Sequence, residues 1–256
     1  MQLPLIPRGM PARAWPPVLA TRGPGGPCQW HSHHSLRFAL AIEGEVRIRT
    51  ARQGKWSSAP GVLTAPDAAH VLDAQGAELL LVFLDPESTA GTSFHAALSG
   101  PLRLISDAER KAMTRDVVPR TILRSGAATW ALQAAETLRL PTPAAPRSVH
   151  PRVRTLLSML RSGGIDDVTS LEVLANAVGL SPSRLMHVFT SSVGIPLRPY
   201  LAWLRVQRAA IEIVSGNSLT DAALAAGFSD AAHMSRTYRR MLGIPPSLLR
   251  AMRCST

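Results

Sequence analysis

The sequence predicts an α+β protein, in which a small β-barrel or sandwich precedes an all-helical C-terminal half. Short apolar stretches separated by turn residues run from His31 to Phe83, which is typical of antiparallel strands. After Asp85 the apolar residues recur at helical spacing, and the last hundred or so residues carry helix signals only. With 256 residues, 46% of them hydrophobic, the chain is long enough for two domains.

The first 30 residues predict an extended arm rather than a regular element. They contain seven prolines, each of which fixes its own backbone and disfavours helix in the residue before it, so we expect regular structure from about Cys28. The prolines also interrupt any apolar helix of signal-peptide length, and the best apolar run, 79–84, is too short to span a membrane. The two cysteines, Cys28 and Cys254, form no CxxC pair. We therefore expect a cytoplasmic protein without membrane association.

Strands are predicted at four apolar stretches of the N-terminal half. These stretches are 36–42, 46–50, 62–65 and 79–84. The segments between them are rich in turn residues, for example Gln53-Gly54-Lys55 and Ala59-Pro60-Gly61. Several short strands at this spacing indicate a small barrel or sandwich.

Helices are predicted next, followed by a linker. The helical segments lie around 93–98, 107–117 and 127–140. The proline-rich stretch 141–146, closed by Pro151, cannot form a regular element and is typical of a linker. The predicted organisation is thus an N-terminal domain at 1–140, a linker at 141–151 and a C-terminal domain at 152–256.

The charge of the chain favours an anionic partner. Lys and Arg number 28 against 17 Asp and Glu, which gives a net charge of +11 and a sequence pI near 11.3. Nucleic acid is the first candidate. A solvated basic face is the commoner explanation of such an excess, so by itself the charge supports nucleic-acid binding only weakly.

That motif is an internal repeat in the C-terminal half. The segment 175–181 (ANAVGLS) recurs as 223–229 (ALAAGFS), 48 residues later, and the tripeptide Gly-Ile-Pro at 194–196 recurs at 243–245. Alanine lets two helices cross closely, glycine permits the positive φ of a turn, and serine caps the next helix, so each copy predicts a helix-turn-helix. A helical bundle can contain one such corner by chance, but two copies on a basic chain favour DNA reading.

Capping signals support the same division into helices. Ser181 precedes Pro182, and both Ser218 with Asp221 and Thr169 with Glu172 have capping-box spacing. Between the two copies, 199–214 predicts a single helix of roughly 24 Å. Such a spacer could hold two recognition helices about 34 Å apart, in successive major grooves of one DNA face.

These residues resemble the AraC/XylS family of bacterial transcription regulators over about 100 residues. The resemblance is carried by 171–209 (LEVLANAVGLSPSRLMHVFTSSVGIPLRPYLAWLRVQRA) and 218–250 (SLTDAALAAGFSDAAHMSRTYRRMLGIPPSLLR). It implies a DNA-binding domain of seven helices with two helix-turn-helix motifs, joined to an N-terminal ligand-sensing or dimerising domain. It also implies a transcription activator rather than an enzyme, with double-stranded DNA, RNA polymerase, a small-molecule effector and a second copy of the chain as partners.

The resemblance assigns DNA contacts by position. The first recognition helix would present Ser183, Arg184, Met186 and His187 to DNA. The second would present Ala231, Ala232, His233, Arg236, Arg239 and Arg240. Among these, Arg236 is the best candidate for reading a base, because a guanidinium can bind guanine O6 and N7 together, with a discrimination of about 1–3 kcal/mol.

A histidine cluster in the N-terminal half resembles the cupin pattern. His31 and His33 point to the same face of a strand, and His70 could complete a three-imidazole site for zinc, iron, copper or nickel. Catalytic cupins add a carboxylate a few residues later, where this chain has Arg37 and Phe38. The cupin-like domain is therefore expected to bind an effector or to use these histidines structurally, with a divalent metal as an alternative. The competing function is a cupin metalloenzyme or metal sensor with a fused helical domain.

Overall fold

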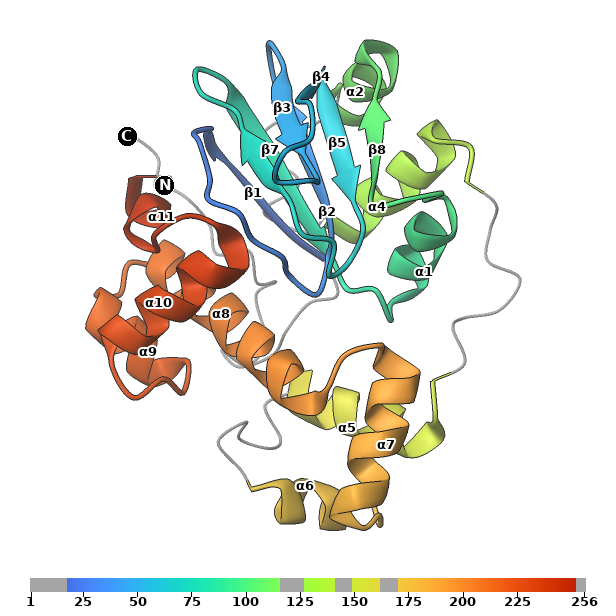
Figure 1. Cartoon of the computed structure of the whole chain (residues 1–256), viewed down its shortest axis with the longest axis vertical. Coiled ribbons are helices and arrows are strands. Elements are labelled where there is room, and N and C mark those ends of the chain that lie inside the picture. Colours follow the sequence, from blue (N-terminus) through green and yellow to red (C-terminus); the bar gives the residue numbers. More distant parts are fainter. Residues whose placement is uncertain (1–17, 116–126, 141–148, 162–169, 252–256) are drawn as a thin grey trace.

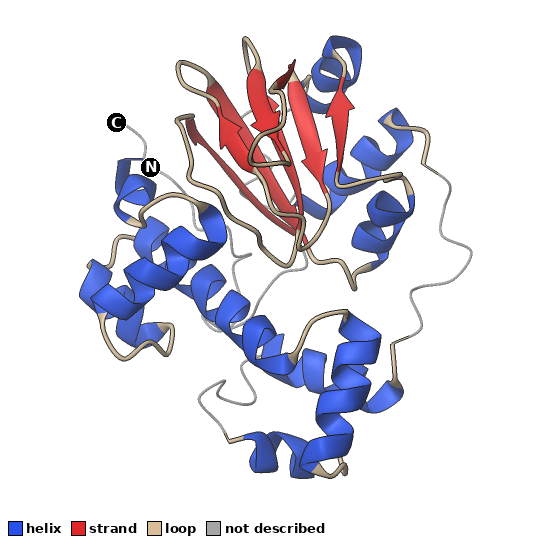
Figure 2. Ribbon diagram, viewed as in Figure 1, coloured by secondary structure: helices blue, strands red, loops and turns tan. Residues whose placement is uncertain are grey.

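The computed structural model describes residues 18–115, 127–140, 149–161 and 170–251. Of these described residues, those up to 140 form the β-rich half and those from 149 onward form the helical half (Figures 1 and 2). The predicted linker separates them, and most of it, 141–148, lies outside the described residues. The division into domains stays a prediction.

The β-rich half contains two antiparallel sheets. The larger sheet has the order β1 (Val18–Pro24), β7 (Glu78–Leu84), β2 (Leu36–Ala41), β5 (Gly61–Thr64) and β8 (Leu102–Ile105). The smaller sheet has the order β4 (Ser57–Ala59), β3 (Val46–Arg49) and β6 (Val71–Asp73). In the larger sheet Phe38 lies opposite Leu63 on β5 and Val82 on β7. All four strands predicted from apolar stretches are thus confirmed.

All six residues of the central strand β2 are buried, because other elements cover both faces of the strand. On one face Phe38 packs edge-on against Phe94 of α1 (Thr89–Ala96) and Trp130 of α4 (Ala127–Thr137), with ring centroids 5.1 and 5.3 Å apart. Met113 of α2 (Asp107–Thr114) belongs to the same cluster. On the other face Ala39 packs with Ile48 of the smaller sheet. The two sheets therefore pack face to face, and a closed barrel of the cupin type stays a prediction.

The strand β1 corrects the prediction of an irregular arm up to Cys28. Its residues pair antiparallel with β7 along the whole strand, from Val18 opposite Leu84 to Pro24 opposite Glu78. Because β1 is an edge strand, one side of its backbone needs no partner in the sheet, and a proline at its end is tolerated. The prediction gave too much weight to the prolines and too little to the β-branched and apolar residues between them.

The helical half consists of two small clusters that share one long helix. Its helices are α5 (Pro151–Arg161), α6 (Leu171–Ala177), α7 (Pro182–Val193), α8 (Leu197–Ser215), α9 (Leu219–Ala225), α10 (Ala231–Leu242) and α11 (Ser247–Ala251). The first part of α8 packs with α5 to α7, and the rest packs with α9 to α11 (Figure 1). At 19 residues, α8 is about 28 Å long. No helix in the described ranges has the length and apolar character of a membrane span.

The helix starts agree with the predicted caps at α7 and α9 and differ at α6 and α10, where Asp230 rather than Ser229 of the second copy caps α10. Ser181 accepts a hydrogen bond from the backbone N–H of Arg184 (3.3 Å), and Ser218 accepts one from Asp221 (3.0 Å). Ser170, rather than the predicted Thr169, caps α6, and Thr169 lies outside the described residues. Each corner contains a glycine with positive φ, Gly179 at 65° and Gly227 at 81°, so both copies of the repeat form the predicted helix-turn-helix.

Candidate DNA-binding face and ligand cavity

The second helix of the first unit, α7, exposes the residues predicted to face DNA. Its buried side carries Leu185, Val188 and Phe189, which join the first core cluster. The predicted contact residues on the opposite side are all exposed: Ser183, Arg184, Met186 and His187. Met186 is 49% exposed, which is unusual for a large apolar side chain and leaves it free to meet a partner. Contact of these side chains with DNA stays a prediction.

The second helix of the second unit, α10, carries a row of arginines. Arg236, Arg239 and Arg240 are exposed and lie at spacings of three and four residues, so they share one helix face. Ala232 is exposed as well, whereas Ala231 is half-buried. Three other residues of α10 face the core: Met234, Thr237 and Tyr238.

His233 is less free than its position in the motif suggests. It is half-buried, its Nδ1 lies 3.1 Å from the Ser229 hydroxyl, and its ring packs against Phe228 with centroids 5.3 Å apart. The backbone N–H of His233 also donates to Asp230, the cap of α10, at 2.6 Å. These contacts make His233 part of the corner that positions α10. Its predicted role as a DNA contact is not tested by the structure.

The two halves of the chain touch where the second Gly-Ile-Pro tripeptide forms a turn. The backbone N–H of Gln29 donates to the carbonyl oxygen of Gly243 at 2.7 Å. Gly243 has φ 73°, and a Cβ atom on it would lie 2.5 Å from Gln29 O and 2.6 Å from His31 Nδ1. Glycine is therefore required here both for the backbone conformation and for the close approach of the β-rich half.

A buried ionic cluster joins the halves at a second place, beside the first unit. Asp85 and Glu87 follow β7, and the guanidinium of Arg161 at the end of α5 contacts both carboxylates, with Glu87 at 3.3 Å. Arg161 also donates to the hydroxyl of Tyr200 on α8 at 2.8 Å. The Asp85 and Glu87 side chains are only 5% and 3% exposed. Carboxylates this buried need a fixed positive charge, and Arg161 supplies it from the other half.

His34 completes the buried ionic cluster from the β-rich half. Its Nε2 lies 3.0 Å from Glu87 Oε1, and its Nδ1 lies 2.7 Å from Asp67 Oδ2. Burial disfavours the charged imidazole, but the hydrogen bonds to Asp67 and Glu87 outweigh it and raise the pKa of His34 to about 9. Burial raises the pKa of Asp85, while the adjacent Arg161 opposes that shift. At neutral pH the cluster thus sets two cations, His34 and Arg161, against the buried pair Asp85 and Glu87.

These pKa values predict that stability falls at alkaline pH. A group whose pKa is raised on folding stabilises the protein fully below its ordinary pKa and loses that contribution as the pH rises through the raised value. For His34 the window runs from 6.5 to about 9, and the raised pKa of Asp85 acts in the same direction. We expect His34 by itself to lower the free energy of unfolding on the order of 3 kcal/mol between pH 6.5 and 9, and Asp85 to add to this fall.

Urea unfolding at several pH values measures this change. His34→Gln is the matched control, because it keeps a polar side chain but cannot carry the charge. A clearly smaller fall between pH 6.5 and 9 in His34→Gln than in the unsubstituted chain is expected, since only Asp85 then contributes. An equal fall in both proteins would show that His34 does not titrate in this window.

The three predicted histidines converge in the β-rich half. His31, His33 and His70 are buried, and each offers a ring nitrogen within 4.8 Å of the others. Backbone hydrogen bonds of 2.9 Å in both directions hold His31 and His70 side by side. The predicted cluster therefore exists, although no sequence signal indicated what lies at its centre.

The centre is the guanidinium of Arg37, a residue of β2. Its Nη1 lies 3.2 Å from His31 Nε2, and its Nη2 lies 2.6 Å from His70 Nε2. The Nδ1 atoms of these two histidines lie 2.8 Å from the carbonyl oxygens of Gln29 and Ala68. Each Nδ1–H thus donates to a carbonyl and each Nε2 lone pair accepts from Arg37. Burial, with Arg37 adding to it, lowers the pKa to about 3 for His31 and about 2 for His70, so both rings are neutral.

With Arg37 in this position the cluster does not fit a metal ion. Three imidazoles whose Nδ1 atoms are held by hydrogen bonds, two to carbonyl oxygens and that of His33 to the Ser35 hydroxyl, are a suitable donor set for zinc. However, the lone pairs of His31 and His70 that a metal needs already accept from Arg37, and a cation there would meet another positive charge. In the sequence, Arg37 was notable only because it stands where catalytic cupins have a carboxylate. In the structure, its guanidinium decides what the cluster can bind.

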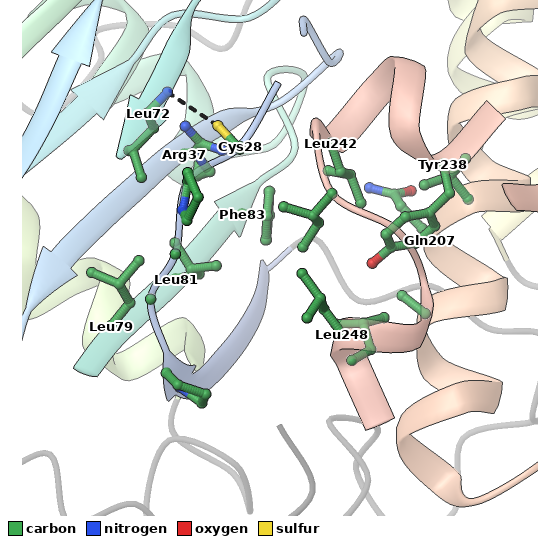
Figure 3. A pocket seen from close by; sticks show the side chains of 18 of the residues that line it. Cys28, Arg37, Leu72, Leu79, Leu81, Phe83, Gln207, Tyr238, Leu242 and Leu248 are labelled. Atoms are coloured by element: carbon green, nitrogen blue, oxygen red, sulfur yellow. Dashed lines mark hydrogen bonds between the residues drawn. The ribbon is translucent and has the colours of Figure 1, made fainter. Parts of the chain in front are cut away.

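A cavity of about 410 Å³ lies between the sheets and the second helix-turn-helix unit. Figure 3 shows its two walls, one from the β-rich half and one from the helices. Its lining includes Leu79, Leu81 and Phe83 of β7, Trp203 and Gln207 of α8, and Tyr238 and Leu242 of α10. Arg37 and Cys28 also line it. Trp203 stacks on His33 with centroids 5.6 Å apart, so the cavity borders the histidine cluster. Sequence reasoning missed this site because it forms only where the halves meet.

Comparison with known proteins agrees with this helical architecture. Residues 174–252 match a family described as helix-turn-helix domain. The HTH-type transcriptional regulator RipA of Corynebacterium glutamicum is 32% identical over 111 residues, which are 43% of this chain and 33% of RipA. An uncharacterized HTH-type transcriptional regulator of Staphylococcus aureus is 34% identical over 85 residues, 33% of this chain and 11% of that protein. The chain thus spans only a small part of these relatives.

Solved structures share the fold of nearly the whole chain. The crystal structure of ToxT from Vibrio cholerae covers 93% of this chain and 98% of ToxT with a TM-score of 0.59, at 9% sequence identity. A structure of unsaturated fatty acid bound wild-type ToxT has a TM-score of 0.57, also at 9% identity, and covers 93% of this chain and 96% of that one. At this identity the likeness concerns the fold alone. The C-terminal part of the chain is a helix-turn-helix domain of the kind found in transcriptional regulators.

Proposed function

We propose that this chain, whose residues 174–252 form a helix-turn-helix domain, is an AraC-type transcription regulator that binds specific DNA and responds to a small effector. The N-terminal domain would be residues 1–140 and the DNA-binding domain residues 152–256. The observation that carries the proposal is the pair of equivalent units, α6–α7 and α9–α10, held apart by the single helix α8. Two exposed recognition helices on one rigid spacer suit two major grooves of the same duplex.

The side chains on these helices support different roles for different residues in DNA binding. Arg236 is exposed on α10 and can reach a guanine edge, while Arg239 and Arg240 lie one turn further along and suit phosphates. On α7, Met186 offers an apolar contact for a thymine methyl group, and Arg184 suits the backbone. The proposal assigns base reading mainly to Arg236 and general affinity to the other arginines.

Replacing Arg236 with alanine is expected to weaken binding to the preferred site by about 10- to 100-fold, the loss of one bidentate contact to guanine. The free energy of unfolding should change by less than about 0.5 kcal/mol, because Arg236 is exposed. The preferred site is first selected from genomic fragments with the unsubstituted chain, and binding is measured by fluorescence anisotropy at fixed salt. Arg52→Ala, an exposed arginine of the β-rich half, is the matched control. Full binding by Arg236→Ala would contradict the assignment of α10.

The effector is proposed to bind in the cavity between the halves rather than inside the β-rich half alone. A molecule there would touch β7 on one side and α8 and α10 on the other, so its binding would favour one relative position of the halves. The fatty-acid-bound structure of ToxT shows that a protein of this fold binds a small molecule. Activation through RNA polymerase and pairing of two copies belong to the same proposal.

A metalloenzyme or metal sensor is the less supported alternative. The donor set of His31, His33 and His70 is present, but Arg37 uses two of the three imidazoles. The relatives that match the helical half carry the names of transcriptional regulators. Both observations favour a binding protein over an enzyme.

A further inference from the structure

We propose that the cavity between the halves binds an apolar molecule with one carboxylate, whose charge pairs with Arg37. The proposal rests on the small effector of the proposed function and names its chemical class. It further assigns to the opposite end of the ligand a hydrogen-bond donor, such as a hydroxyl group, which would meet Gln207.

Arg37 is a buried cation without a counter-ion. Its side chain lies in the cavity lining, the residue is only 4% exposed, and among the described residues no carboxylate pairs with it. Its hydrogen-bond acceptors are the neutral His31 and His70, and its Nε is buried without any partner. Burial lowers the pKa of Arg37 to about 10, which still leaves it charged at neutral pH. A buried charge of this kind costs stability unless an anion joins it, and a carboxylate is the planar partner that a guanidinium prefers.

Gln207 is a second unsatisfied polar group in the same cavity. It belongs to α8, is 6% exposed, and its buried Oε1 has no hydrogen-bond partner within the described ranges. Figure 3 places Gln207 and Arg37 on opposite walls, with the ring of Phe83 between them. An amide oxygen accepts hydrogen bonds, so it suits an O–H or N–H group of a ligand. The guanidinium of Arg37 and the amide oxygen of Gln207 thus define the two ends of a molecule that lies across the cavity.

The remaining walls define the body of this molecule. Leucine, phenylalanine and tryptophan side chains from both halves line the space between Arg37 and Gln207. A volume of about 410 Å³ lies within the range of small-molecule sites, which is about 300–1,000 Å³. Sugars and nucleotides would bury many polar groups against these walls without partners, and a cation would meet Arg37. The lining therefore selects an apolar monocarboxylate.

The test compares three probes of equal chain length on the full-length protein. Decanoate, 1-decanol and decylammonium are titrated by isothermal calorimetry, below the concentrations at which they aggregate. One decanoate per chain is expected to bind at least about tenfold more tightly than 1-decanol, the effect of one hydrogen-bonded ion pair, and decylammonium is expected not to bind. Equal affinity for decanoate and 1-decanol, or preference for decylammonium, would overturn the proposal without any substitution.

Substitutions then locate the two ends of the ligand. Arg37→Gln should abolish the preference for decanoate over 1-decanol, whereas Arg103→Gln, which changes a half-exposed arginine outside the cavity, should keep it. For Gln207, 10-hydroxydecanoate is expected to bind the unsubstituted chain more tightly than decanoate, and Gln207→Leu should remove that gain. An undiminished preference in Arg37→Gln would assign the charge recognition elsewhere. If Arg37→Gln does not fold, the probe comparison on the unsubstituted chain decides.

DNA binding is measured separately, so that the two proposals can fail independently. A chain that binds specific DNA but does not distinguish the three probes overturns the carboxylate proposal alone. A chain that prefers decanoate but binds no DNA above random competitor overturns the proposed function alone.

Discussion

Replacing Arg161 with leucine is expected to lower the free energy of unfolding by about 3–5 kcal/mol, the effect of removing one partner from a buried ion pair. Arg161 contacts Asp85 and Glu87, and both carboxylates are almost fully buried. Without the guanidinium, His34 is the one cationic partner of Glu87 among the residues that the structure describes, and the hydroxyl of Tyr200 loses its donor. Chemical denaturation of the full chain at pH 7 measures the change.

A surface arginine provides the matched control. Arg103 of β8 pairs with Glu109 at 2.7 Å, but both side chains are partly exposed, at 32% and 23%. Solvent screens such a pair, so Arg103→Leu should cost no more than about 1 kcal/mol. A loss for Arg161→Leu as small as for Arg103→Leu would show that the buried ionic cluster does not hold the halves together.

The double substitution Arg161→Leu with Glu87→Gln separates two explanations of the loss. If the cost arises from an uncompensated charge, neutralising Glu87 should recover a large part of it, because the effects of contacting residues are not additive. If the cost arises only from lost packing of the Arg161 side chain, the two substitutions should simply add. The first result is expected, since the Glu87 side chain is only 3% exposed and solvent therefore cannot readily replace Arg161.

The parts of the fold that the sequence predicted depend on local signals. The two helix-turn-helix units are predictable because Gly179 and Gly227 form the turns, and Ser181 and Ser218 cap helices that begin directly after them. The central strands were found for the same reason, since apolar runs between turns identify them without knowledge of the sheet order. By contrast, β1 is stabilised by β7, some 60 residues away, and it follows a proline-rich stretch and itself ends on Pro24.

The parts of the candidate site that the sequence missed depend on distant contacts. Arg161 and Glu87 are 74 residues apart, and neither lies in a recognisable motif. The convergence of His31, His33 and His70 was predictable from strand alternation and the cupin resemblance, and the structure confirms it. The position of the Arg37 guanidinium between them was not predictable, because a charged residue in the strand LRFALA does not indicate which distant side chains it will contact. The cavity requires both halves and so has no local signature at all.

Removing the Arg37 side chain is expected to turn the histidine cluster into a metal site. In Arg37→Ala the Nε2 lone pairs of His31 and His70 become free, while Gln29 and Ala68 still hold both Nδ1–H groups. His33 already has a buried Nε2 without a partner. Three nitrogens bound to zinc at about 2.1 Å lie about 3.4 Å from one another, so the ring nitrogens, which now lie within 4.8 Å of one another, need to move closer by about an ångström.

Cobalt(II) titration of the full-length protein measures the change, because tetrahedral cobalt has visible absorption and binds where zinc does. Arg37→Ala is expected to bind one cobalt ion per chain at least about tenfold more tightly than the unsubstituted protein, since the fixed Nδ1–H groups that orient metal ligands are already in place. The double substitution Arg37→Ala with His70→Ala is the control and should lose this binding, because it removes one of three ligands. If Arg37→Ala binds no more cobalt than the unsubstituted chain, the guanidinium is not what excludes a metal. In that case the three imidazoles cannot reach positions from which they coordinate one ion together.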